Sequence, residues 1–129
     1  MLGQARVGAT IPVSDRERAK DFYTGTLGLT VQEETGSDVM FAAGDGTGLG
    51  AYETPHAGTA QHTLAAFLVD DLDATMAALR ERGVTFAEYD LPGLKTENGV
   101  AVVDGERGAW FKDPDGNILA IGERTGAGA

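Results

Sequence analysis

The sequence predicts an α+β fold made of two tandem modules, each containing a strand, a helix and three further strands. Two strand-to-helix junctions, Val13-Ser14-Asp15 and Val69-Asp70-Asp71, lie about 56 residues apart, which indicates an internal repeat. A glycine, Gly28 or Gly83, follows each helical segment where a left-handed helix end is expected. Short apolar segments separated by turn residues then follow each helix, as in a sheet.

The first module covers about residues 5–55. Residues 6–13 are expected to form a strand, and Ser14-Asp15-Arg16-Glu17 has the pattern of a capping box in which Ser14 accepts the Glu17 amide. One face of the following helix is marked at intervals of three and four residues by Ala19, Phe22, Tyr23, Thr26 and Leu27. Further strands are predicted at 29–34, 39–43 and 49–53.

The second module covers about residues 61–123, after a linker at 54–60. A strand at 62–69 leads to Asp70 or Asp71 as the cap of a helix whose apolar face carries Leu72, Met76 and Leu79. Further strands are predicted at 85–89, 109–112 and 118–122. Residues 90–106 are expected to be irregular, and a segment of this length either covers a ligand or forms a dimer contact. Residues 124–129 are expected to form a C-terminal tail.

The composition excludes several classes of function. A protein of 129 residues with 42% hydrophobic and 23% charged residues is expected to form one globular domain, and a cytoplasmic location is expected because no secretory signal is recognisable. The absence of cysteine excludes disulfides, thiolate metal sites and a cysteine nucleophile. A net charge of −10 disfavours nucleic acid and anionic membranes as partners and favours a cationic small molecule.

Two motifs connect this organisation to a known family. Residues 18–23 lead to Leu27-Gly28-Leu29, and the turn Asp113-Pro114-Asp115-Gly116-Asn117 joins two apolar strands. Together with the duplicated order, they make residues 7–121 resemble the vicinal oxygen chelate superfamily, which includes glyoxalase I, bleomycin-resistance proteins, fosfomycin-resistance enzymes and extradiol dioxygenases. The resemblance implies curled mixed sheets that form a cradle around a cavity, with the helices outside. These motifs cap helices and turn strands, so they indicate a fold more than a chemistry.

The resemblance also implies where a metal would lie, because metal-dependent members carry ligands on the first, fifth and last strands. Counting from the motifs places at these positions Gly8, Leu64 and Ala120, none of which binds a metal through its side chain. His62 shares the face of Leu64, but the only nearby carboxylate on the last strand, Glu123, falls on the face opposite Ala120. We therefore expect neither a metal nor another cofactor, and a structural or solvent-facing role for His62.

Small residues at the ligand positions favour an apolar pocket for a bulky, partly flat molecule. Trp110 is expected to offer an indole face to an aromatic ring or a cation, or else to fill the core. The ligand-binding residues are predicted to be Thr10, Tyr52, Leu64, Ala66, Tyr89, Trp110 and Ala120. The leading hypothesis is a metal-free protein of the bleomycin-resistance type that sequesters an aromatic or cationic antibiotic without a chemical step. Resemblance further implies a homodimer.

Two alternatives stay open at this point. One is a glyoxalase-like lyase or isomerase with a non-standard metal site, or a metal-free enzyme that uses Tyr52, Tyr89 or Glu53 as acid or base. The other is a structural or regulatory module without a ligand. The Gly-rich residues 43–50 are interpreted as a hairpin turn, since no helix and lysine follow as in a phosphate-binding loop. His56 is expected in a surface loop.

Overall fold

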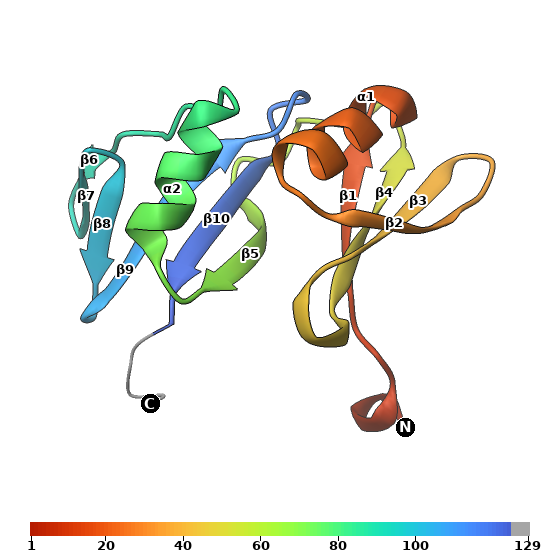
Figure 1. Cartoon of the computed structure of the whole chain (residues 1–129), viewed down its shortest axis with the longest axis horizontal. Helices are drawn as coiled ribbons and strands as arrows, with labels where there is room; N and C mark the ends of the chain where they lie inside the picture. Colours follow the sequence, from red (N-terminus) through yellow and green to blue (C-terminus); the bar gives the residue numbers. More distant parts are fainter. Residues whose placement is uncertain (125–129) are drawn as a thin grey trace. The chain divides into compact units, whose positions relative to one another are not determined.

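The computed structural model describes residues 1–124, and the protein divides into two compact units, Met1–Thr59 and Ala60–Ala129. Each unit contains one mixed sheet with a helix on one face (Figure 1). The α+β class predicted from the sequence is therefore confirmed. Among the described residues, no helix is long and apolar enough to cross a membrane.

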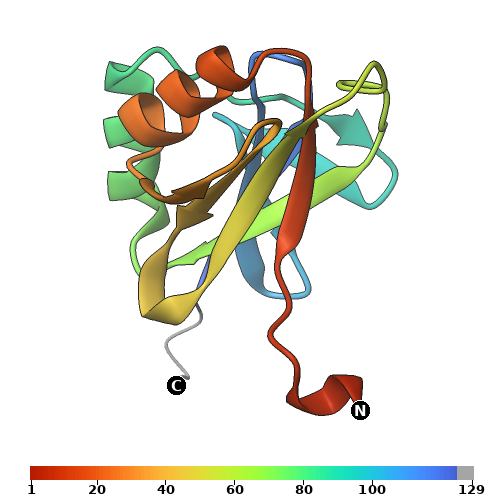
Figure 2. The ribbon, with the colours of Figure 1, turned by 90° about the vertical axis from the view of Figure 1, so that its right-hand side faces the viewer.

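Unit 1 contains a four-stranded sheet in the order β1-β4-β3-β2. Strands β1 and β4 are parallel, and the other neighbours are antiparallel. The short N-terminal turn η1 is separated from β1 by extended backbone, as Figure 2 shows from the side. The elements of this unit are η1 (Leu2–Gln4), β1 (Ala9–Val13), α1 (Arg16–Lys20), η2 (Asp21–Thr26), β2 (Thr30–Glu34), β3 (Asp38–Ala42), η3 (Gly44–Gly46) and β4 (Gly48–Glu53).

The core of unit 1 lies between its sheet and its helical segment. Alternation along the strands sends one set of side chains into this core, and Tyr23 of the helical segment stacks on Phe41 of β3 with ring centroids 5.4 Å apart. The fully or almost fully buried residues are Ile11, Val13, Ala19, Tyr23, Val39, Phe41, Leu49 and Ala51. On β1, Ile11 and Val13 are the residues that alternation sends into this core.

Three details of the first module differ from the prediction. The first strand begins at Ala9, and Val7, which lies inside the predicted strand 6–13, is exposed and outside it. The helix cap is Asp15, whose Oδ1 accepts the amides of Glu17 and Arg18, because the backbone leaves the extended conformation one residue later than expected. Beyond Lys20 the helix widens into a π-helical segment, and Gly28 then has the expected positive φ of 83°.

Unit 2 contains a six-stranded sheet in the order β5-β10-β9-β8-β7-β6. Strands β5 and β10 are parallel, so the first and last strands of each unit pair in the same way. The elements are β5 (Thr63–Val69), α2 (Leu72–Glu81), β6 (Asp90–Leu91), β7 (Leu94–Glu97), β8 (Val100–Val103), β9 (Glu106–Lys112) and β10 (Ile118–Glu123). Figure 1 shows α2 lying across one face of this sheet.

The largest difference concerns residues 84–106. Instead of a strand at 85–89, only Phe86 forms an isolated bridge, to Phe111. Residues 90–106, expected to be irregular, contain β6, β7 and β8. Tight turns connect these strands and β9, so that each pairs with the next in antiparallel orientation. Two of these turns contain Asn98-Gly99 and Asp104-Gly105, all with positive φ, which is the geometry of short hairpin turns. Of the predicted tail, residues 125–129 lie outside the described residues.

The turn between β9 and β10 is held by its own polar side chains. Asp113 accepts the backbone amides of Asp115 and Asn117 on Oδ1, both at 2.9 Å, and its Oδ2 accepts the side-chain amide of Asn117 at 2.8 Å. Asp113 and Asn117 are both buried. This closed network fixes the register in which Trp110 pairs with Ala120.

Candidate functional site

The candidate site lies on the face of the unit 2 sheet that points away from α2, called the far face below. Leu119 and Ile121 of β10 are buried on the α2 side, so Ala120 and Gly122 belong to the far face. Across the strands, Ala120 pairs with Ala66 of β5 and with Trp110 of β9. The sheet thus brings together three of the predicted ligand-binding residues in one row.

A second row, made of two glycines and a leucine, lies beside the first. Gly122 of β10 pairs with Leu68 of β5 and with Gly108 of β9. The Leu68 side chain is 69% exposed and lies against Gly122, since a Cβ on that glycine would be 3.4 Å from Leu68 Cδ2. The indole of Trp110 extends toward Gly108, where a Cβ would be 3.9 Å from Cη2. Gly108 was not predicted as a site residue, although alternation along 106–112 places it on the face of Trp110.

Trp110 has an aromatic partner in Tyr89. Their ring centroids lie 5.8 Å apart at an interplanar angle of 86°, an edge-to-face arrangement. The segment that carries Tyr89 is joined to β9 by the bond from the Ala87 amide to the Trp110 carbonyl, 2.8 Å long. Both aromatic residues are half-buried. The far face therefore combines small side chains with an oriented aromatic pair.

The position of Tyr89 is set by a polar network behind it. The Tyr89 amide donates to Thr96 Oγ1 at 2.8 Å, and the Thr96 hydroxyl donates to Glu88 Oε1 at 2.5 Å. The Gly99 amide also donates to the Glu88 carboxylate, at 3.0 and 3.1 Å from its two oxygens. The hydrogen bond from Thr96, followed by that from Gly99, lowers the pKa of Glu88. Sequence reasoning did not identify Glu88 or Thr96, because neither belongs to a recognisable motif.

Leu64 lies in β5, as predicted, at an irregularity in the pairing of β5 with β10. The register between β5 and β10 shifts between Ile118, which pairs with Thr63, and Leu119, which pairs with Ala65. Leu64 falls at this irregularity, so Ala66 is the residue beside Ala120. Counting residues from Asp71 could not reveal a bulge inside the strand.

The remaining predicted residues, Thr10 and Tyr52, belong to unit 1. Thr10 pairs with Gly50 and Tyr52 with Pro12, on the face of the unit 1 sheet opposite the buried Ile11 and Ala51. Met40 lies on the same face, and its sulfur covers Gly50, because a Cβ on that glycine would be 2.8 Å from Sδ. Met40 was not predicted, although its buried neighbours Val39 and Phe41 place it on this face.

The residues at the expected metal positions do not fit a metal ion. Gly8, Leu64 and Ala120 carry no donor side chain, and within residues 1–124 no group of three or more His, Asp or Glu is arranged to hold one. His62 is exposed, with Nδ1 3.2 Å from the Thr63 carbonyl oxygen. Glu123 lies on the α2 side, as expected, where it accepts the Leu72 amide.

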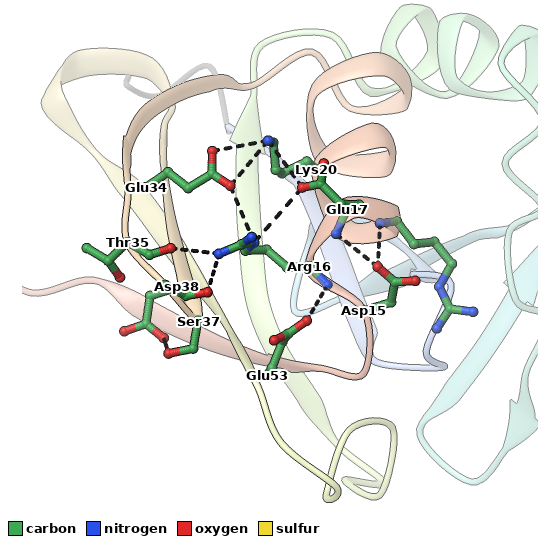
Figure 3. Close-up of polar contacts among 11 residues, drawn as sticks. Asp15, Arg16, Glu17, Lys20, Glu34, Thr35, Ser37, Asp38 and Glu53 are labelled. Atoms are coloured by element: carbon green, nitrogen blue, oxygen red, sulfur yellow. Dashed lines mark hydrogen bonds and ion pairs between the residues drawn. The ribbon is translucent and has the colours of Figure 1, made fainter.

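Glu53, considered above as an acid or base, is part of a charged network in unit 1 (Figure 3). Its Oε2 accepts the Arg16 amide at 3.0 Å, and the Arg16 guanidinium donates to the Thr35 and Gly36 carbonyl oxygens. Arg16 Nε also lies 3.3 Å from Glu34, which binds Lys20 at 3.1 Å. These contacts join the start of α1 to the β2–β3 turn and the end of β4, which is a structural role.

The same network changes the pKa of Lys20. The ammonium group lies 3.1 Å from Glu34 and 3.3 Å from Glu17. Its hydrogen bonds to Glu34 and then to Glu17 raise the pKa of Lys20. A lysine whose charged form is favoured in this way is a poor general base.

Comparison with protein-family models gives a match over residues 5–121 to the Glyoxalase/Bleomycin resistance protein/Dioxygenase superfamily. The match includes both units and the Asp113–Asn117 turn. No curated protein matches the sequence.

Similar solved structures carry related descriptions. TnmS3, an antibiotic binding protein from Streptomyces sp. CB03234, is 28% identical with a TM-score of 0.67, over 95% of this chain and 99% of that one. A glyoxalase/bleomycin resistance protein from the same organism is 31% identical with a TM-score of 0.64, over 88% of this chain and 95% of that one. A superfamily member from Sphaerobacter thermophilus DSM 20745 is 28% identical with a TM-score of 0.68, over 95% of this chain and 100% of that one.

Proposed function

We propose that this protein, which belongs to the Glyoxalase/Bleomycin resistance protein/Dioxygenase superfamily, binds an aromatic small molecule on the far face of unit 2 without a chemical step. The observation that carries the proposal is the edge-to-face pair of Trp110 and Tyr89 beside the small residues Ala66 and Ala120. A flat ring placed over these small residues contacts the indole of Trp110.

The physical basis is burial and stacking. An oriented aromatic contact contributes about 0.5–1.5 kcal/mol beyond the burial of its area. Tyr89 packs against the indole in an edge-to-face pair, so the indole ring is partly ordered before a ligand arrives, and less entropy is lost on binding. Small residues beside Trp110 allow a planar molecule to approach the sheet closely. This arrangement therefore favours a planar, rigid ligand.

The net charge of the protein limits the kinds of ligand that it is expected to bind. The protein has a net charge of −10, which repels anions and raises the local concentration of cations. An indole face also attracts a cationic group, with a gain of about 0.5–2 kcal/mol depending on exposure. We therefore infer a neutral or cationic aromatic ligand. The antibiotic-binding description of TnmS3 supports an antibiotic-like compound. We propose self-resistance to such a compound as the role of this binding.

Unit 1 contributes a second set of predicted contacts. Thr10 has a hydroxyl group, Tyr52 combines a ring with a hydroxyl group and is 39% exposed, and Met40 is 40% exposed. A polarisable thioether packs well against aromatic rings. We propose that Thr10 and Tyr52 are ligand-binding residues of unit 1, and that Leu64 is a ligand-binding residue of unit 2.

The test is a binding titration followed by Trp110 fluorescence, since Trp110 is the only tryptophan of the sequence. A panel of planar cationic and planar neutral compounds is compared with planar anions of similar size. Saturable quenching by members of the first two groups supports the proposal. No quenching across the panel contradicts it and favours a module without a small-molecule ligand.

The enzymatic alternative has its own test. The purified protein is analysed for divalent metals and assayed for glyoxalase-type lyase and isomerase activity before and after chelation. A stoichiometric ion that is lost together with activity would overturn binding without chemistry. Binding that persists unchanged after chelation supports it.

We also propose that the protein forms a homodimer, as inferred from the family resemblance. Sedimentation equilibrium at several protein concentrations tests this directly. A monomeric mass at all concentrations contradicts it. The cytoplasmic location expected from the sequence stays a prediction.

A further inference from the structure

The turn between β7 and β8 contains the only Asn-Gly dipeptide of the sequence, Asn98-Gly99. Asn98 has φ 52° and Gly99 has φ 82°, which is the conformation of a tight hairpin turn. Asn98 is exposed, whereas Gly99 is buried. A Cβ on Gly99 would lie 2.9 Å from Phe86 Cβ, so this position requires glycine. The fold therefore requires glycine at position 99, directly after an asparagine, and this dipeptide is prone to deamidation.

Asparagine followed by glycine is prone to deamidation because glycine offers no side chain to hinder attack by its nitrogen. The Gly99 nitrogen loses its proton to hydroxide and attacks Asn98 Cγ, which forms a new bond between these atoms and closes a succinimide ring. Nδ2 takes a proton from water, which regenerates the hydroxide, and the bond between Asn98 Cγ and Nδ2 breaks as ammonia leaves. Water then opens the ring at one of its two carbonyls, which gives aspartate or isoaspartate at position 98. Water is the only co-reactant.

In this fold the attacking nitrogen is held by a carboxylate. The Gly99 N–H donates to both oxygens of Glu88, at 3.0 and 3.1 Å. A hydrogen bond to an anion favours the protonated amide, and the carboxylate charge opposes a negative charge on the same nitrogen. On the other side, the Arg80 guanidinium donates to the Asn98 carbonyl oxygen at 2.9 Å, which further restrains the turn.

We propose that Asn98 is a deamidation site of this protein and that the Glu88 carboxylate slows the reaction by holding the Gly99 amide. The inference is independent of the proposed ligand. Conversion to isoaspartate inserts a methylene group into the backbone of a two-residue turn. That turn adjoins the Glu88–Thr96 network, so the modification disturbs the support of Tyr89.

The experiment compares the wild type with Glu88→Gln and with the matched control Glu97→Gln. Glu97 is an exposed carboxylate next to Asn98 in sequence. Each protein is incubated at one mildly alkaline pH, both folded and in denaturant. Conversion at position 98 is measured by peptide mapping with isoaspartate detection. The folded rate is divided by the denatured rate of the same variant, which cancels effects of sequence on intrinsic reactivity.

The expected result is a low ratio in the wild type and in Glu97→Gln, and a ratio about tenfold higher in Glu88→Gln, because a neutral acceptor holds the amide less strongly. Glu88→Asp keeps the negative charge on a shorter side chain, so its folded-to-denatured rate ratio is expected to lie between those of the wild type and Glu88→Gln. This variant replaces Glu88→Gln in the comparison if Glu88→Gln does not fold. Equal ratios in the wild type and both Glu88 variants overturn the proposal. Conversion that occurs at Asn117 instead of Asn98 also overturns it.

Discussion

Glu123, the last residue of β10, accepts the backbone amide of Leu72, the first residue of α2, at 2.9 Å. Unit 1 contains the same relationship, since Glu53 at the end of β4 accepts the amide of Arg16 at the start of α1, at 3.0 Å. In both units this glutamate pairs across the sheet with a valine two residues before the helix cap. The internal repeat thus extends to the bonding of the helix N-terminus, where a carboxylate also interacts favourably with the helix dipole.

Replacing Glu123 by Gln is expected to destabilise the protein by about 1–2 kcal/mol, because a charged acceptor at a helix N-terminus is lost. The loss includes the ion pair of Glu123 with Arg107, 3.1 Å long. Urea unfolding of the variant measures the change. Glu106→Gln, which removes an exposed carboxylate from β9, is the control and is expected to change stability by less than about 0.5 kcal/mol. Equal stabilities of the two variants would contradict this role of Glu123.

Two glycines of β4 are expected to respond differently to alanine. A Cβ on Gly48 would overlap the backbone carbonyl oxygen of Phe41, which cannot move without breaking the sheet. A Cβ on Gly50 would meet the Met40 thioether, a flexible group that can rotate away. We expect Gly48→Ala to cost about 2 kcal/mol or more and Gly50→Ala clearly less. Thermal unfolding of both variants checks the order, and a larger loss for Gly50→Ala would contradict it.

Thr96 is expected to control the environment of Trp110 from a distance. Thr96→Val removes the hydroxyl that accepts the Tyr89 amide and donates to Glu88, so Tyr89 loses part of its restraint. The expected result is a weaker near-ultraviolet circular dichroism signal from Trp110, with an unchanged far-ultraviolet spectrum. Thr85→Val, at an exposed position, is the matched control. An unchanged near-ultraviolet spectrum in Thr96→Val would show that Tyr89 is held by other contacts.

The carboxylate of Glu88 gives a prediction for pH. Hydrogen bonds from Thr96 and Gly99 lower the pKa of Glu88 in the folded protein below its ordinary value of 4.5. Its contribution to stability is therefore fully present above 4.5 and is lost as the pH falls through the folded pKa. The difference in unfolding free energy between the wild type and Glu88→Gln should stay constant at neutral pH and shrink in acid. If this difference in unfolding free energy grows in acid, the pKa of Glu88 is not lowered in the folded protein.

The sequence predicts those parts of the fold that depend on local chemistry. The Asp113–Asn117 turn, the left-handed Gly28 and Gly83, and the apolar face of α2 are fixed by neighbouring residues, and all three are confirmed. The strands within residues 90–106 differ from the expected irregular segment, because their pairing depends on the hairpin turn at Asn98-Gly99.

The candidate site was only partly predictable. Alternation correctly places Ala66, Ala120 and Trp110 on one face, since side chains alternate in any regular strand. The register shift beside Leu64 leaves no sequence signal, so the residues opposite β10 could not be paired in advance. The Glu88–Thr96–Gly99 network connects residues that only folding brings together, so it could not be inferred before the fold was known.

The most direct test of the proposed binding function is calorimetric titration of Trp110→Leu with a planar compound that the wild type binds. Loss of the indole face is expected to weaken affinity about tenfold to a hundredfold through lost stacking and apolar burial. Phe22→Leu, which removes a half-buried ring from the helical segment of unit 1, is the control and should retain the wild-type affinity. Unchanged affinity in a folded Trp110→Leu protein would contradict binding at the far face.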